Sequence, residues 1–98
     1  MNQYFFDIEL VSTLSEEYIS LIPEQRNVIN KLLQQGTVSN FALSSDRTKS
    51  WLTITANSEE EAINIVNSFP LRPFMNFSVH PLIFQLQSSM YFPQLSLN

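Results

Sequence analysis

The sequence predicts an α+β fold in which four strands and two helices follow one another in the order βαββαβ. Four segments alternate with the two-residue period of a strand, and two segments carry apolar residues at helical spacing. Pro70 and Pro73 frame a turn before the last strand, because each proline fixes its own φ and disfavours helix in the residue before it. The length of 98 residues suits one small domain.

The first strand and the first helix are expected between residues 3 and 35. Residues 3–11 alternate and are rich in aromatic and branched side chains, which favours a strand. Thr13 and Glu16 have the spacing of a capping box, so a helix is predicted over residues 14–35. Its apolar face is formed by Tyr18, Leu21, Ile22, Val28, Ile29, Leu32 and Leu33.

Two residues are expected to affect the course and the end of this helix. Pro23 predicts either a kink or a second helical segment capped by Ser20. Gly36 is the only glycine of the chain, and it stands where a helix C-cap requires a left-handed backbone. The helix is therefore expected to end at this glycine.

The remaining elements are predicted as strands at residues 38–44, 50–56 and 74–79 and a helix that ends near Ser68. Ser58 and Glu61 form a capping box for that helix. The same box, with acids favoured by the helix dipole, explains the acidic run at residues 59–61 better than a metal site does.

This order of elements is the ferredoxin-like plan, with an expected sheet order of 4-1-3-2 and both helices on one face. Pro81 agrees with it, since a proline near the end of an edge strand removes no needed ladder bond. The fold class predicted is therefore α+β, ferredoxin-like.

Composition excludes several classes of function. The chain has no cysteine and one histidine, which argues against a disulfide framework and against a structural metal site within one protomer. A net charge of −4, with five scattered basic residues, argues against a nucleic-acid partner. No apolar stretch is long enough to span a membrane and no signal peptide is evident, so a cytoplasmic location without a membrane partner is expected.

Strand alternation leaves one sheet face without a helix, which we call the open face. Its predicted residues mix aromatic and polar side chains: Phe5, Asp7, Glu9, Trp51, Thr53, Thr55, Phe74, Asn76, Ser78 and His80. Such a mixture suits a dimer interface and also a small-molecule pocket. The two interpretations are compatible.

His80 is the candidate acid–base residue of the open face. The first and last strands are neighbours in the expected order, so Asp7 or Glu9 is expected near His80 and would fix its tautomer. The alternative is a histidine that is exposed or bonded to backbone, beside ordinary solvated acids.

The stretch Pro70-Leu71-Arg72-Pro73-Phe74-Met75, followed by alternating residues and Pro81, resembles the muconolactone isomerase family. The resemblance extends over about residues 21–89. It implies a ferredoxin-like domain at residues 1–89, with a tail at 90–98, that pairs its open faces into dimeric α+β barrels and sometimes larger rings. The chain is accordingly expected to form a homodimer or a larger ring.

The resemblance also implies a site. Isomerases of this family carry an acidic–basic pair on the first helix, of which this sequence keeps the basic member as Arg26 and replaces the acid by Gln25. An amide cannot accept the proton. Four further polar or aromatic positions also depart from the isomerases: Asn40, Ala42, Leu43 and Ser50. Arg72, in the proline-framed turn, offers a positive charge to a carboxylate.

Two function hypotheses follow. The first is a cofactor-free, metal-free isomerase that shifts a proton in a small carboxylated lactone or related ring, with His80, Arg26 and Glu9 as catalytic residues. Its expected ligand-binding residues are Gln25, Trp51, Phe74, Asn76 and Arg72. The second is a non-catalytic dimeric barrel that binds a small molecule or is structural. The related small monooxygenases are a weaker third alternative.

Overall fold

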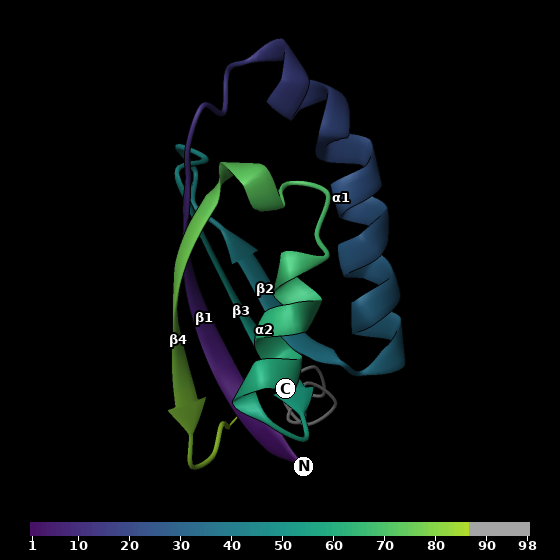
Figure 1. Ribbon diagram of the computed structural model, residues 1–98, viewed down its shortest axis with the longest axis vertical. Helices are drawn as coiled ribbons and strands as arrows, with labels where there is room; N and C mark the ends of the chain where they lie inside the picture. Colours follow the sequence, from purple (N-terminus) through teal and green to yellow (C-terminus); the bar gives the residue numbers. More distant parts are fainter. Residues whose placement is uncertain (87–98) are drawn as a thin grey trace, which may run out of the picture.

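The computed structural model describes residues 1–86 of the chain, and it has the predicted element order (Figure 1). The elements are β1 (Asn2–Leu10), α1 (Glu16–Gln35), β2 (Val38–Leu43), β3 (Lys49–Ala56), α2 (Glu59–Asn67), the short 3₁₀ helix η1 (Arg72–Phe74) and β4 (Met75–Leu82). The predicted boundary between residues 89 and 90 and the tail at 90–98 lie outside the described residues.

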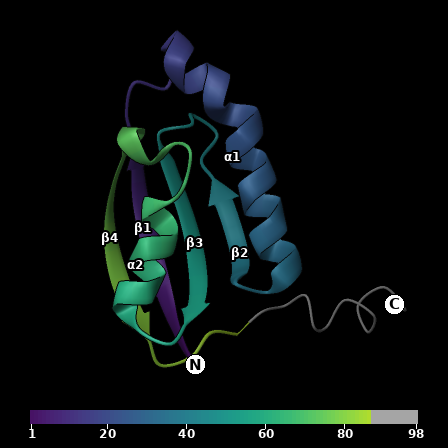
Figure 2. The ribbon, with the colours of Figure 1, turned by 45° about the vertical axis from the view of Figure 1, so that its right-hand side comes forward.

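The sheet is antiparallel throughout, with the strand order β2-β3-β1-β4. This confirms the predicted order 4-1-3-2. Pro81 lies on β4, an edge strand, opposite Tyr4 of β1. Both helices cover the same face of the sheet, with α1 beside β2 and α2 beside β3 (Figure 2). No helix among residues 1–86 is long and apolar enough to cross a membrane.

The start of α1 differs from the prediction. The N-cap is Ser15, whose Oγ accepts a hydrogen bond from the backbone N–H of Tyr18 at 3.2 Å and donates one to the carbonyl of Ser12 at 2.9 Å. Ser12 has a positive φ of 55°, which turns the chain before the helix. The predicted capping box at Thr13 is therefore wrong, because this turn delays the first helical residue to Glu16.

The interior and end of α1 combine one correction with one confirmation. The helix continues through Pro23 as a single element, so the alternative of a second segment capped by Ser20 is wrong. The hydroxyl of Ser20 instead donates to the carbonyl of Glu17 at 2.8 Å. Gly36 has a φ of 79°, and its N–H bonds to the carbonyl of Leu33, which confirms the predicted C-cap.

Around α2, the expected N-cap is confirmed, since Ser58 Oγ accepts from the N–H of Glu61 at 3.1 Å. The proline-framed turn contains η1, with Pro73 in its first turn. Phe74 ends η1, and β4 begins one residue later at Met75. The prediction that Phe74 belongs to the last strand is therefore wrong.

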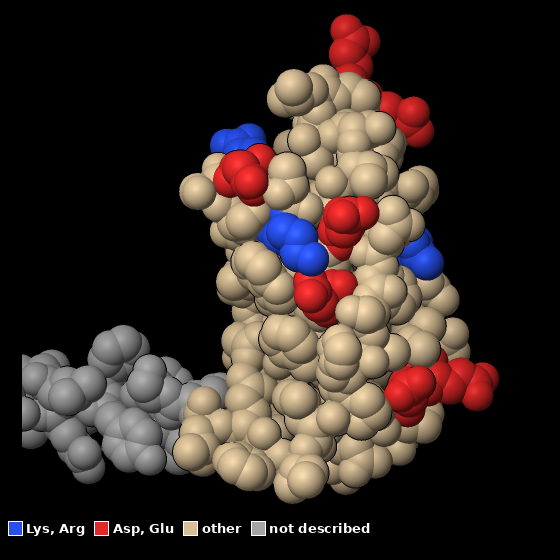
Figure 3. All heavy atoms as spheres, turned by 90° about the vertical axis from the view of Figure 1, so that its left-hand side faces the viewer, with Lys and Arg blue, Asp and Glu red and all other residues tan. Residues whose placement is uncertain are grey.

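The core lies between the sheet and the helices, as the alternation predicted. The buried residues of β1 and β3 include Phe6, Ile8, Leu10, Leu52, Ile54 and Ala56. Figure 3 shows the opposite, open face. Charged side chains gather in its upper half and at one edge, and a wide uncharged area lies below them.

Candidate functional site

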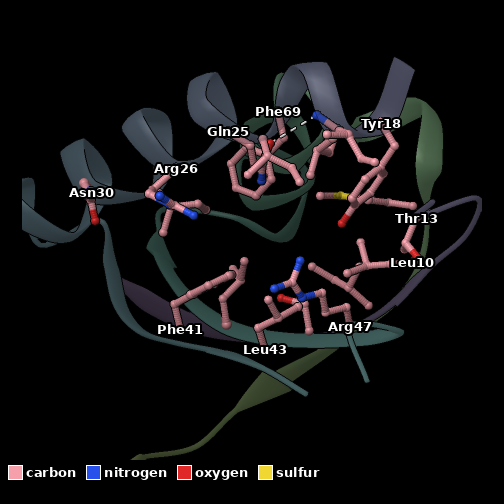
Figure 4. A pocket seen from close by; sticks show the side chains of 18 of the residues that line it. Leu10, Thr13, Tyr18, Gln25, Arg26, Asn30, Phe41, Leu43, Arg47 and Phe69 are labelled. Atoms are coloured by element: carbon pink, nitrogen blue, oxygen red, sulfur yellow. Dashed lines mark hydrogen bonds between the residues drawn. The ribbon is translucent and has the colours of Figure 1, made fainter. Parts of the chain in front are cut away.

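A cavity lies between α1 and the helix-covered face of the sheet, on the side away from the open face. Its volume is about 450 Å³. We call it the α1 cavity (Figure 4). This volume falls within the ~300–1,000 Å³ of typical small-molecule sites. The open face was the predicted place for a pocket, and this cavity lies on the other side of the sheet.

The α1 wall of the cavity follows from helical periodicity. Tyr18, Ile22, Gln25 and Ile29 recur three or four residues apart and share one face of the helix. Arg26 lies beside them at the edge of that face. The helix therefore presents an apolar stripe with one amide and one phenol, flanked by a guanidinium.

The floor and the far end of the cavity are mostly apolar. They are formed by Ile8, Leu10, Leu52, Phe69, Leu71 and Met75. Ser50 adds a hydroxyl, but its Oγ donates to the carbonyl of Ala42 at 3.1 Å. The lining thus combines an apolar body with a few polar groups, as ligand pockets usually do.

Gln25 joins α1 to the proline-framed turn. Its Oε1 accepts a hydrogen bond from the backbone N–H of Leu71 at 3.1 Å, and its side chain is buried with only 8% exposed (Figure 4). A buried N–H without this acceptor would be destabilising. The amide therefore positions the turn that closes one end of the cavity. Contact of Gln25 with a ligand stays a prediction.

Tyr18 supplies a hydroxyl that faces the cavity (Figure 4). Its ring packs edge-on against Phe74, with 5.4 Å between ring centroids. Burial raises the pKa of the Tyr18 phenol, and the nearby positive charge of Arg47 opposes that shift without reversing it. The phenol is therefore a neutral hydrogen-bond donor at neutral pH. Phe74 thus lies on the helix-covered side, which corrects its predicted place on the open face.

The cavity also carries two arginines, one on each wall. Arg26 projects from α1 and Arg47 from the turn between β2 and β3 (Figure 4). Among residues 1–86, neither forms an ion pair. Asp46 also lines the cavity, but its Oδ1 accepts from Ser44 Oγ and from the N–H and hydroxyl of Thr48. The Asp46 carboxylate therefore stabilises the turn through these hydrogen bonds.

The open face does not assemble the predicted acid–base pair. In the β1–β4 register, His80 lies opposite Phe5, and their ring centroids are 6.4 Å apart. His80 Nε2 bonds to Ser78 Oγ at 3.1 Å, while Asp7 pairs with Lys49 at 2.6 Å. The predicted pairing of His80 with Asp7 or Glu9 is therefore wrong, because the register places each carboxylate opposite another residue.

Glu9 and Asn76 do meet on the open face. They are register partners, and they line a shallow hollow of about 230 Å³ together with Asp7, Lys49, Phe77 and Ser78. Trp51 lies opposite Asp7 on the same face, half-buried. Among residues 1–86, no group of three or more potential metal ligands comes together.

Arg72 holds the proline-framed turn together. Its Nε donates to Asn67 Oδ1 at 2.7 Å and its Nη1 donates to the carbonyl of Met75 at 2.7 Å. Its guanidinium carbon lies 4.8 Å from the centroid of the Phe77 ring. These contacts occupy the guanidinium, and binding of a carboxylate by Arg72 stays a prediction.

Comparison with known proteins identifies the family. The family model described as muconolactone delta-isomerase matches residues 6–85. The chain belongs to the muconolactone delta-isomerase family. No curated protein matches the sequence.

Solved structures share the fold of this family member. A crystal structure of muconolactone isomerase aligns with a TM-score of 0.70 and 16% identity, over 88% of this chain and 93% of that one. A 5-chloro-2-hydroxyhydroquinone dehydrochlorinase from Burkholderia phenoliruptrix, in complex with 2,5-dihydroxybenzoquinone, aligns with a TM-score of 0.65 and 14% identity, over 91% and 98%. At such identities the likeness establishes the fold, and the chemistry rests on the residues of this chain.

Tyr18 and Arg47 line the cavity of this family member, but the sequence did not predict them as site residues. Tyr18 counted only as part of the helical apolar face, although its seven-residue spacing from Gln25 places both on one side of α1. Arg47 lies in a polar turn, and only the tertiary fold shows that this turn meets the N-terminal half of α1. Spacing along the helix was the usable signal for Tyr18, and nothing in the sequence marked Arg47.

Proposed function

We propose that the protein binds a small carboxylated ring compound in the α1 cavity. The observation that carries this proposal is an apolar cavity of about 450 Å³ with the guanidinium of Arg26 at its edge. A flat apolar ring matches the floor, and a carboxylate matches the planar donors of an arginine. The family relationship supports the same ligand class, because a muconolactone isomerase is named for a lactone substrate.

The proposed activity is binding, without efficient proton transfer. A proton shift needs a group that accepts a proton from carbon. The titratable groups of the described lining are Tyr18, Arg26, Asp46 and Arg47. The raised pKa keeps Tyr18 protonated, arginine is always protonated, and the hydrogen bonds that lower the pKa of Asp46 make it a weak base. Gln25 cannot accept the proton either.

Isomerase activity is the second candidate, with Arg26, His80 and Glu9 as its catalytic residues. The family supports this function. In one chain, however, Arg26 lies at the α1 cavity while Glu9 lines the hollow on the open face. Since the two groups occupy opposite sides of the sheet, the geometry favours binding over isomerisation.

We also propose that the protein forms a homodimer through the open face, as the sequence predicted. Phe5 and Trp51 are half-buried on a face that neither α1 nor α2 covers. Aromatic side chains are enriched in interfaces. The uncharged area below the charged groups of that face offers the surface for a second copy (Figure 3).

Calorimetric titration with muconolactone, alongside a turnover assay, tests the proposed activity. We expect saturable binding, and turnover below the ~1–10³ s⁻¹ that enzymes typically reach. Arg26→Gln should weaken binding, whereas Lys31→Gln, which removes an exposed cation from the same helix outside the cavity, should not. Turnover in the enzymatic range that Arg26→Gln abolishes would establish the isomerase instead. Absence of binding at millimolar concentration would refute the proposed ligand class.

A further inference from the structure

The turn between β2 and β3 is built to hold Arg47 in one backbone conformation. Arg47 has a positive φ of 64°, which a side chain other than glycine adopts only at a cost. The turn is closed by the bond from the Arg47 N–H to the carbonyl of Ser44 at 2.9 Å. Asp46 Oδ1 adds bonds from Ser44 Oγ at 2.7 Å, Thr48 N at 3.0 Å and Thr48 Oγ1 at 2.8 Å. This network fixes the point from which Arg47 projects.

From that point, the Arg47 guanidinium faces the cavity across from α1 (Figure 4). Its charge is close enough to Tyr18 to counteract part of the rise in the pKa of that phenol. Arg26 lies on the α1 side of the same cavity. The cavity therefore has a cation on each of two facing walls, with the Tyr18 hydroxyl on the α1 wall as a neutral donor.

The charge balance of the lining favours anions. Arg26 and Arg47 form no ion pair among residues 1–86, and no described side chain accepts a hydrogen bond from either guanidinium. Asp46 is the only carboxylate among the described lining residues, and its Oδ1 accepts hydrogen bonds from three donors of the turn. Both guanidinium groups thus keep their donors available for a ligand.

We propose that the ligand of the α1 cavity carries two anionic oxygen groups, one at each end of its ring, and that Arg47 is the residue that selects the second group. This inference rests on the proposed function, since it refines the ligand of the same cavity. Arg26 binds the first carboxylate. Arg47, supported by the Tyr18 hydroxyl, binds the second one with the planar donors that suit a carboxylate.

Calorimetry with three probes of one ring type tests this proposal: benzoate, isophthalate and terephthalate. The two dicarboxylates differ in spacing, and we expect at least one of them to bind roughly threefold to tenfold more tightly than benzoate. This gain in affinity lies between the gain typical of an exposed ion pair and that typical of a charge-assisted hydrogen bond. Arg47→Gln should remove this advantage, so that the variant binds neither dicarboxylate more tightly than it binds benzoate. Glutamine carries the same backbone strain at a positive φ, so the comparison isolates the guanidinium.

Arg47→Lys and Lys31→Gln complete the test. Lysine keeps the charge but loses the planar donors, so the dicarboxylate advantage should be reduced and not abolished. Lys31→Gln removes one positive charge away from the cavity and should change nothing. Equal binding of all three probes, unaffected by Arg47→Gln, would overturn the role of Arg47 and leave the proposed function standing. Failure of all three probes to bind would overturn both.

Discussion

At the scale of single residues, Gln25 shows how a change of chemistry is compatible with an unchanged scaffold. The amide lies where the resemblance places an acid, and its Oε1 caps a buried N–H of the proline-framed turn at 3.1 Å. A carboxylate would accept the same bond. The hydrogen bond therefore needs only an acceptor at position 25, whereas proton transfer needs a carboxylate that can accept a proton.

We predict that Gln25→Ala lowers the free energy of unfolding by about 1–3 kcal/mol, because the N–H of Leu71 stays buried without an acceptor. Gln34→Ala removes an exposed glutamine from the same helix and should change it by less than about 0.5 kcal/mol. Urea unfolding of both variants measures the difference. Equal stability of the two would show that the Gln25–Leu71 bond contributes nothing.

Asp46 is expected to make the stability of the fold depend on pH in the acid range. Hydrogen bonds from Ser44 and then Thr48 hold the pKa of Asp46 below its usual value of 3.8. A lowered folded-state pKa stabilises the fold fully above the unfolded value, and that contribution is lost as pH falls through the folded value. Asp46→Asn should therefore be less stable than the wild type at neutral pH, and the gap should narrow as pH falls below the usual carboxyl value of 3.8 and close below the folded-state pKa. A gap that does not depend on pH would rule out this source.

Among the elements, α1 begins at a different N-cap from the one that the sequence predicts. Thr13 and Glu16 have capping-box spacing, yet Ser15 makes the cap. Ser15→Ala should cost about 0.5–2 kcal/mol of stability, the usual range for a lost N-cap. Thr13→Ala should cost less than about 0.5 kcal/mol. Thermal or urea unfolding decides between them, and a larger loss for Thr13→Ala would restore the predicted capping box.

The elements themselves were largely predictable because each has a local cause. Alternation, the caps at Gly36 and Ser58, and the prolines of the turn are readable in sequence order. The pairing of His80 with a carboxylate was not predictable in this way. Strand order makes β1 and β4 neighbours, but the register that sets Phe5 opposite His80 depends on where β4 begins. The predicted place of Phe74 was wrong for the same reason, because Phe74 belongs to η1 and β4 begins only at Met75.

At the scale of the whole molecule, the sheet divides the protein into two surfaces with different expected partners. The helix-covered side contains the α1 cavity, and the open side presents Phe5 and Trp51. The cavity could not be foreseen from the sequence, because it depends on how far α1 stands from the sheet and where the β2–β3 turn lies. Its apolar floor is formed by residues of the hydrophobic core.

We predict that light scattering at micromolar concentration shows two or more chains in the native protein. Trp51→Glu should raise the dimer dissociation constant by roughly tenfold or more, because it replaces an aromatic side chain of the proposed interface by a charge. Ile19→Glu adds the same charge at a half-exposed position of α1, on the helix-covered side of the sheet, and should leave the dimer intact. A stable wild-type monomer at this concentration would contradict the barrel arrangement.

The α1 cavity, and not the open face, is the proposed binding site for a small carboxylated ring. Chemical-shift mapping of backbone amides during titration with benzoate tests this proposal most directly. We expect saturable shifts clustered around Tyr18, Arg26 and Arg47, with none around Glu9, Asn76 and His80. Shifts confined to the open-face residues, or no shifts at millimolar benzoate, would contradict this proposal.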